Sequence, residues 1–366
     1  MITLRSVVYL LTASILMGCG RSATTAMTST ATTEPSTPPT TKAPIVETSP
    51  TQTEGVMRSA TAAATSSPSP VPATRTPSPG TIVVDHDSVA LFSQIPDEYV
   101  VAAEHLRMLY MDRSVGQNIN DALDCLQFPN TQSAPNRCSR TEHVDPAYSV
   151  DPSVVAWNRP GGYDRSNWVF QTWPQGPCSS WDQKIGCFLN FIAPVIGQYD
   201  VVSYQLSYLA VDSGSSINDQ PGGFFFDNPS IDDVFDQEAF EAAHPDKVFI
   251  YWTTSLARGI GTEVSDTFNQ NMREYAVSHG EPLFDVADIL SHTPDGSPCF
   301  DNRDGVPYSN GNSSEDYPDD GQERLAICPQ YTTEVDGGHL GSVSSGSITV
   351  AKAFWVLMAQ IAGWTP

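Results

Sequence analysis

Basic residues are scarce in this sequence: 18 Lys and Arg stand against 42 Asp and Glu, and the formal net charge is −24. The imbalance lies after residue 80, where 39 acidic and 13 basic residues leave a net charge of −26. A surface of this kind repels phosphate groups, which excludes nucleic acid and anionic lipid headgroups as principal ligands. Solubility outside the cell is the simplest meaning of the acidity itself.

The sequence also lacks an apolar run long enough to cross a membrane. An apolar stretch from Val7 to Met17 follows Arg5, as is typical of a secretory signal peptide. It ends in Leu16-Met17-Gly18-Cys19, which resembles the bacterial lipobox. We therefore expect a signal peptide over residues 1–19 and a lipid anchor on Cys19, which makes the membrane a partner through that anchor. A cleaved signal peptide followed by a chance Cys is the alternative.

Aromatic and large aliphatic residues are nearly absent from residues 20–80, which consist largely of Ser, Thr, Pro and Ala. Such a segment cannot bury enough apolar surface to offset the entropy of ordering it. We interpret it as a disordered tether, semi-extended by its prolines. Residues 81–366 then form one large extracytoplasmic domain.

Metal-binding cysteine motifs are absent, because no Cys-x-x-Cys or His-x-x-x-His spacing occurs. Six cysteines remain after Cys19, and an even number in an oxidising compartment indicates disulfides. Sequence order favours three local pairs, although other connectivities stay open: Cys125–Cys138, Cys178–Cys187 and Cys299–Cys328.

Strand and helix patterns alternate along the domain. Short apolar runs without clean alternation predict strands buried on both faces, at residues 107–111, 199–206, 247–252 and 282–286. Helical patterns lie between and after them, at residues 118–123, 237–243, 263–278 and 347–362. This order predicts an α/β fold, a parallel sheet flanked by helices on both faces. Residues 127–186, rich in Pro, Gly and Cys, are interpreted as disulfide-stapled irregular loops that form a wall of a cleft.

Two short segments carry candidate catalytic residues. Ser114 directly follows the first predicted strand, where active sites of parallel sheets assemble. Asp336-Gly337-Gly338-His339 precedes the last helix. A serine nucleophile needs a base, and the base needs a carboxylate that orients it, which an Asp three residues before a His can supply. Taken alone, Ser114 is typical of a helix cap and residues 336–338 of a tight turn.

Together these segments resemble the SGNH (GDSL-like) hydrolase superfamily, from Leu106 to Trp364. The resemblance implies a flavodoxin-like three-layer fold, with Ser114 as nucleophile, Asp336 as orienting acid and His339 as general base. Two family motifs are missing: Gly-Asp-Ser around the nucleophile and the Gly-x-Asn-Asp block that supplies an oxyanion donor. Gln205, at the end of the second predicted strand, and the backbone of Gly162 or its neighbour Gly161 are the substitutes to test; a structural hydrogen bond is the alternative for Gln205.

Carboxylates also gather in the loop bracketed by Cys299 and Cys328. Asp301 and Asp304 offer hard oxygen ligands suited to Ca²⁺, although Arg303 interrupts the EF-hand spacing. A solvated acidic loop is the alternative. Tryptophans near the glycine loop suggest either sugar stacking or packing within an insertion: Trp157, Trp168, Trp173 and Trp181.

These observations predict an extracytoplasmic, lipid-anchored serine hydrolase that needs no cofactor. Its expected substrate is an acylated carbohydrate or another ester, and the reaction is that of an esterase or deacylase. The alternative is a lipid-anchored carbohydrate- or solute-binding protein that keeps the hydrolase fold without turnover. The missing oxyanion block favours that alternative, whereas the Ser114, Asp336 and His339 pattern favours the enzyme.

Overall fold

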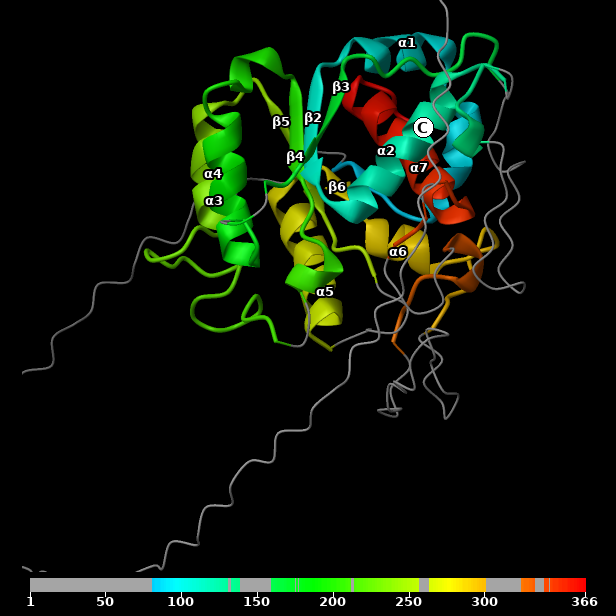
Figure 1. The fold of residues 1–366 in the computed structure, drawn as a ribbon. Helices are drawn as coiled ribbons and strands as arrows, with labels where there is room; N and C mark the ends of the chain where they lie inside the picture. Colours follow the sequence, from blue (N-terminus) through cyan, green and yellow to red (C-terminus); the bar gives the residue numbers. More distant parts are fainter. Residues whose placement is uncertain are drawn as a thin grey trace, which may run out of the picture. The chain divides into compact units, whose positions relative to one another are not determined.

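Six parallel strands form the sheet of this protein in the computed structural model (Figure 1). The structure describes residues 81–130, 133–138, 159–174, 176, 178–211, 214–256, 263–300, 324–332, 339–341 and 343–366. Across the sheet the strand order is β1-β6-β5-β4-β2-β3. In chain order the strands are β1 (Val83–Val84), β2 (Met108–Asp112), β3 (Trp168–Thr172), β4 (Val201–Tyr204), β5 (Val248–Trp252) and β6 (Leu283–Phe284).

Helices cover both faces of this sheet, which confirms the predicted three-layer α/β class. One face is covered by α1 (Asp97–His105), α2 (Ser114–Gln127), α6 (Val286–Ser291) and α7 (Ser345–Ile361). The other face is covered by α3 (Trp181–Ile192), α4 (Val234–Ala243) and α5 (Glu263–His279). Short 3₁₀ helices connect several elements: η1 (Asp87–Gln94), η2 (Asn136–Cys138), η5 (Ile196–Gln198), η6 (Tyr208–Ala210) and η7 (Pro329–Tyr331).

The two faces of the sheet belong to two separate hydrophobic cores. In β2, Met108 and Tyr110 pack into the core that contains α2 and α7. Leu109 and Met111 pack into the core that contains α3, α4 and α5. Successive side chains of a strand point to opposite faces, so a strand covered on both sides is apolar throughout. This is why the strand patterns in the sequence do not alternate.

The chain changes direction across the sheet at β2. From β2 it proceeds to β3 on one side, and it then returns to β4 on the other side and continues to β5 and β6. The ends of β2 and β4 therefore flank a topological switch point, where the loops diverge and leave a crevice that ligands use in open α/β sheets. Ser114 follows one of these strands and Gln205 follows the other.

The interpretation of residues 127–186 as irregular loops is wrong in part. This stretch contains β3, which pairs with β2 in register from Trp168 beside Met108 to Thr172 beside Asp112. It also contains the first turns of α3, which begins at Trp181. β3 is an edge strand with an exposed Val169, so its sequence lacks the long apolar run by which buried strands are predicted. The short β1 was not predicted either, because a strand of two residues is too short to show a pattern of apolar residues.

Three disulfides confirm the predicted local pairing. The Cα–Cα distances are 5.5 Å for Cys125–Cys138, 6.0 Å for Cys178–Cys187 and 5.1 Å for Cys299–Cys328. Disulfides persist in oxidising compartments, so they indicate an extracytoplasmic location. Within the described ranges, no helix combines the length and the apolar character that a membrane span requires.

Candidate active site

Ser114 lies where the sequence predicts it, at the first position of α2 and directly beyond the carboxyl end of β2. Its side chain is exposed, whereas the neighbouring Asp112 and Val115 are buried. A hydroxyl at this point is accessible to a substrate and lies beside the positive end of the helix dipole. The position is therefore suited to a nucleophile that develops negative charge near it.

A set of hydrogen bonds fixes the turn that carries Ser114. The backbone N–H of Gly116 donates to Oδ2 of Asp112 at 2.7 Å, and the hydroxyl of Tyr110 donates to the carbonyl of Gly116. A Cβ on Gly116 would lie 2.5 Å from Cβ of Asp112 and 2.8 Å from the ring of Phe170. Glycine is required here by space, and the first turn of α2 is held against β2 and β3.

Asp112 is a buried carboxyl directly beneath this turn. Burial raises the pKa of Asp112 to about 7. Hydrogen bonds from the backbone of Arg113 and Gly116 and the positive charge of Lys184 lower this pKa, but their effect is smaller than that of burial. Lys184 is itself buried, and burial lowers its pKa. Neither residue has a signature in the sequence, because a carboxylate at a strand end and a lysine in a helix become a pair only when the fold brings them together.

His339 lies near the same end of the sheet. The amide of the next residue, Leu340, donates to Oδ1 of Asn118 at 3.0 Å, and Asn118 is one turn beyond Ser114 in α2. The imidazole of His339 meets the ring of Tyr208, in η6 after β4, edge to face at 6.4 Å. The backbone carbonyl of His339 accepts from Thr332 Oγ1 at 2.5 Å. The segment of His339 is thus attached to the helix of Ser114 and to the loop after the neighbouring strand.

Gln205 is buried and its amide is engaged by the protein. Its backbone N–H donates to the carbonyl of Met111 at 3.0 Å. With the amide nitrogen turned toward Asp112, the side chain donates to Oδ2 of Asp112 at 2.9 Å and accepts from the backbone of Ser255 at 3.1 Å. None of its surface reaches solvent. This arrangement favours a structural hydrogen bond over an oxyanion donor.

The structure does not bring Gly162 to Ser114. A Cβ on Gly162 would lie 2.1 Å from the carbonyl of Gln127, and Gln127 is the last residue of α2. An α-helix rises about 1.5 Å per residue, so this loop lies about 20 Å from the end of α2 that carries Ser114. Gly162 packs against the opposite end of the helix instead, and its neighbour Gly161 is exposed.

The remaining predicted residues fall into two groups. Cys19, Asp301, Asp304 and Asp336 lie outside the described residues, as does Trp157. The other three tryptophans are buried, and Trp168 packs against Trp355, with the rings tilted and their centroids 4.3 Å apart. Trp168, Trp173 and Trp181 are therefore packing residues, the alternative to sugar stacking.

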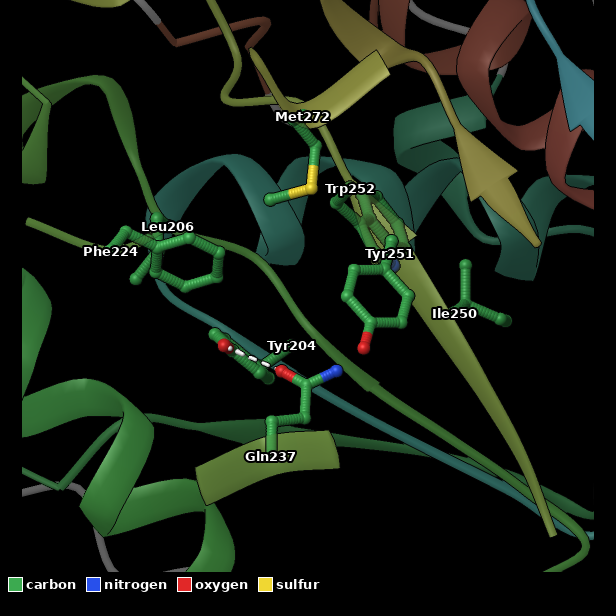
Figure 2. Close-up of a pocket in the computed structure, with 8 residues that line it drawn as sticks. All are labelled: Tyr204, Leu206, Phe224, Gln237, Ile250, Tyr251, Trp252 and Met272. Atoms are coloured by element: carbon green, nitrogen blue, oxygen red, sulfur yellow. Dashed lines mark hydrogen bonds between the residues drawn. The ribbon is translucent and has the colours of Figure 1, made fainter. Parts of the chain in front are cut away.

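A small cavity lies on the other side of the sheet, between β4, β5, α4 and α5 (Figure 2). Figure 2 shows Tyr204 donating to Gln237 at one wall of this cavity, at 2.9 Å. Its volume of about 10 Å³ is close to that of a single water site. Neither Ser114 nor His339 lines it, so it is part of the core and not a substrate pocket.

In comparisons with known proteins, no family model, no curated protein and no solved structure matches this chain. The site therefore has to be interpreted from its own geometry. That geometry brings an exposed Ser114 and the segment of His339 to one helix at the switch point, and it adds Asp112, Asn118 and Tyr208 to the residues found from the sequence.

Proposed function

We propose that the chain is an extracytoplasmic serine hydrolase, an esterase or deacylase that acts on an acylated carbohydrate or another ester near the cell envelope. One observation carries this proposal: exposed Ser114 begins α2 at the switch point, and the segment of His339 is hydrogen-bonded to the same helix one turn further on. Acyl transfer requires a nucleophile and a base that are held close together, and here the segment of the base is attached to the rigid helix that begins with the nucleophile.

The proposed reaction proceeds through an acyl-enzyme. The hydroxyl of Ser114 attacks the ester carbonyl carbon while His339 accepts its proton, and Asp336 orients and stabilises the imidazolium. The tetrahedral intermediate collapses, the carbon–oxygen bond to the alcohol breaks, and His339 returns the proton to the leaving alcohol. A water molecule then attacks the acyl-enzyme in the same way and releases the acid and free Ser114.

Backbone N–H groups of α2 are the proposed oxyanion donors in place of Gln205. An α-helix offers no acceptor to the N–H groups of its first turn. Gly116 already donates to Asp112, so the N–H groups of Ser114 and Val115 are the ones next to the reacting carbon. One donor of this kind typically contributes about 2.7–4 kcal/mol of transition-state stabilisation.

The anchor is proposed together with the activity. Diacylglycerol on Cys19 and a flexible tether over residues 20–80 would hold the domain near the membrane. Cys19→Ala should abolish lipid attachment and leave the fold of the domain unchanged. Intact mass and detergent partitioning measure this, and a variant that partitions into detergent as the unsubstituted protein does would contradict the anchor.

Covalent labelling tests the nucleophile. A fluorophosphonate should label the unsubstituted protein at Ser114, and Ser114→Ala should lose both labelling and turnover of a short-chain aryl ester. His339→Ala should cost about as much, and the double variant little more, because the residues act as a unit. Ser345→Ala is the matched control, since Ser345 also begins a helix, and it should keep full activity. A folded Ser114→Ala protein with unchanged ester hydrolysis would refute the mechanism.

Binding without turnover is the second candidate, and the buried amide of Gln205 favours it, because the predicted side-chain oxyanion donor is engaged elsewhere. The same labelling experiment separates the two. Saturable glycan binding by a protein that no fluorophosphonate labels would identify a lipid-anchored binding protein.

A further inference from the structure

Three side chains of the types that bind metal ions meet near the edge of the sheet that is opposite β3. His86 follows β1, Asp288 lies in α6 and His292 directly follows α6. The strands that precede them are parallel neighbours, with Val84 beside Phe284, so both segments leave the carboxyl end of the sheet side by side. One nitrogen or oxygen atom from each of the three residues lies within 4.8 Å of the others.

Asp288 is the centre of this cluster. Its Oδ2 lies 2.5 Å from Nδ1 of His86 and accepts the backbone N–H of His86 at 2.9 Å. Nδ1 of His292 lies 2.9 Å from the backbone carbonyl oxygen of Asp288 and 3.3 Å from its Oδ1. The two imidazole rings are stacked, with 4.1 Å between their centroids and 13° between their planes. Both imidazoles are thus arranged around one carboxylate.

These separations suit a single ion. Ligands arranged tetrahedrally at about 2.0–2.2 Å from one Zn²⁺ lie about 3.3–3.6 Å apart. The distances in the cluster extend from 2.5 Å to at most 4.8 Å and bracket that spacing. Only small side-chain rotations are needed, and the side chains of His86, Asp288 and His292 have room for them, with 24%, 19% and 15% exposure.

The surrounding backbone is rigid. The N–H of Cys299 donates to the carbonyl of Ser291 at 2.7 Å, and the N–H of Cys328 donates to the carbonyl of Leu290 at 2.9 Å. These two cysteines form a disulfide, so the end of α6 that precedes His292 is hydrogen-bonded to two segments that are covalently joined to each other. A site held by a rigid frame loses little conformational entropy when it binds an ion.

We propose that His86, Asp288 and His292 bind one divalent transition-metal ion, and that this ion is Zn²⁺ or one of its first-row neighbours. Two imidazoles and one carboxylate favour Zn²⁺ and its first-row neighbours, whereas Ca²⁺ and Mg²⁺ prefer sites made of oxygen alone. Oδ1 of the exposed Asp87 lies 3.4 Å from Nε2 of His86 and is the outer acceptor that orients this ring.

The ion would connect parts of the chain that are far apart in sequence. His86 and Asp288 are 202 residues apart, and the ion would fix the segment after β1 to α6 at the edge of the sheet. Since an ion that binds only the folded state stabilises it, Zn²⁺ should raise the melting temperature. This site shares no residue with the proposed hydrolase site and stands or falls independently of it.

Calorimetric titration of the full-length chain with Zn²⁺ tests the site. All proteins carry Cys19→Ser, because the six other cysteines are paired and a free thiol would compete for the metal. We expect one saturable equivalent of Zn²⁺ and a rise in melting temperature that EDTA reverses. Asp288→Asn and His292→Gln should each weaken the affinity at least about 10-fold.

His244→Gln is the matched control, because His244 also follows a helix and its Nδ1 also faces the carbonyl four residues before it. It should bind Zn²⁺ as the unsubstituted protein does. No saturable binding, or binding that both Asp288→Asn and His292→Gln retain, would overturn the proposal and leave a hydrogen-bonded cluster only. If a variant fails to fold, Co²⁺ absorption of the unsubstituted protein decides: a nitrogen-coordinated spectrum supports the site, and the spectrum of aqueous Co²⁺ overturns it.

Discussion

Glu241 is a carboxyl group that the fold keeps out of water on the face of the sheet away from Ser114. It is buried in α4, and its Oε1 accepts from Nε2 of Gln237 at 2.8 Å and from the hydroxyl of Tyr251 at 2.9 Å. Burial raises the pKa of Glu241 to about 8, despite these two donors, which lower it. At neutral pH the folded protein therefore holds a proton at this position that the unfolded chain releases.

The stability of the protein should fall as the pH rises through the pKa of Glu241. The pKa of Glu241 is higher in the folded protein than in the unfolded chain. Its contribution to the free energy of unfolding is therefore complete below about pH 4.5 and lost above about pH 8. At about 1.4 kcal/mol per pKa unit, the loss between about pH 6 and about pH 9 is about 2–3 kcal/mol. Glu241→Gln, which resembles the protonated form, should remove this loss, as urea unfolding at the two pH values will measure.

Glu274→Gln is the control for this experiment, because Glu274 is exposed in α5 and its Oε1 accepts from Nε2 of Gln270 in the same helix. It should leave the pH dependence of the free energy of unfolding as it is in the unsubstituted protein. The pKa of Asp112 is also raised, so Asp112 adds to the pH dependence of the free energy of unfolding in the same way in the unsubstituted protein and in both variants. The difference in pH dependence between these proteins therefore reports on Glu241 alone. Equal pH dependence with and without Glu241→Gln would contradict the assignment.

At the scale of elements, α2 organises the candidate site. Its first residue is Ser114, its fifth is Asn118, and its last is Gln127, against which the loop of Gly162 packs. Asn118 links this helix to the segment of His339. It is a positioning residue, since it acts on the base through the backbone of Leu340.

Asn118→Ala should lower kcat/KM of the proposed hydrolase about 10- to 100-fold, because a displacement of about 1 Å costs that much in catalysis. The protein should stay folded and should still be labelled slowly at Ser114 by a fluorophosphonate. Gln117→Ala is the control, because Gln117 is exposed and bonds only along its own helix to Asp121. Unchanged kinetics in a folded Asn118→Ala protein would show that the link does not position His339.

The elements that sequence patterns predicted are those with a long apolar face or a buried strand. β2, β4 and β5 appear as apolar runs, and α5 and α7 repeat apolar residues at helical spacing. β3 stayed hidden because it is an edge strand with exposed positions, and α3 because its start lies among cysteines and prolines. Strand order has no local signal, so the sheet order could not be derived from the sequence.

At the scale of the whole molecule, the residues that define a site come from distant parts of the chain. Ser114 was found because its place after a strand has a local signature. Asn118 beside Leu340 and His86 beside Asp288 were not, because their contacts span 222 and 202 residues and depend on the strand order. The disulfides were predictable because each closes a local loop, of 13, 9 and 29 residues in sequence separation.

Those three disulfides should decide whether the domain is folded at all. In the loop-entropy description, loops of these lengths contribute about 3, 3 and 4 kcal/mol. Their sum of about 10 kcal/mol is comparable to the whole free energy of unfolding of a typical domain, about 5–15 kcal/mol. The fold should therefore depend on the oxidising compartment that the cysteines indicate.

Full reduction of the disulfides should unfold the protein or strongly lower the guanidinium concentration at the midpoint of its unfolding. Reduced and alkylated protein should lose near-ultraviolet circular dichroism at room temperature, while oxidised protein kept in the same buffer serves as the control. Among double Cys→Ala variants, loss of Cys299–Cys328 should cost the most, because this pair closes the longest loop. If reduced and oxidised protein unfold at the same guanidinium concentration, the fold does not depend on its disulfides. The need for an oxidising compartment would then no longer be a reason to place the folded domain outside the cytoplasm.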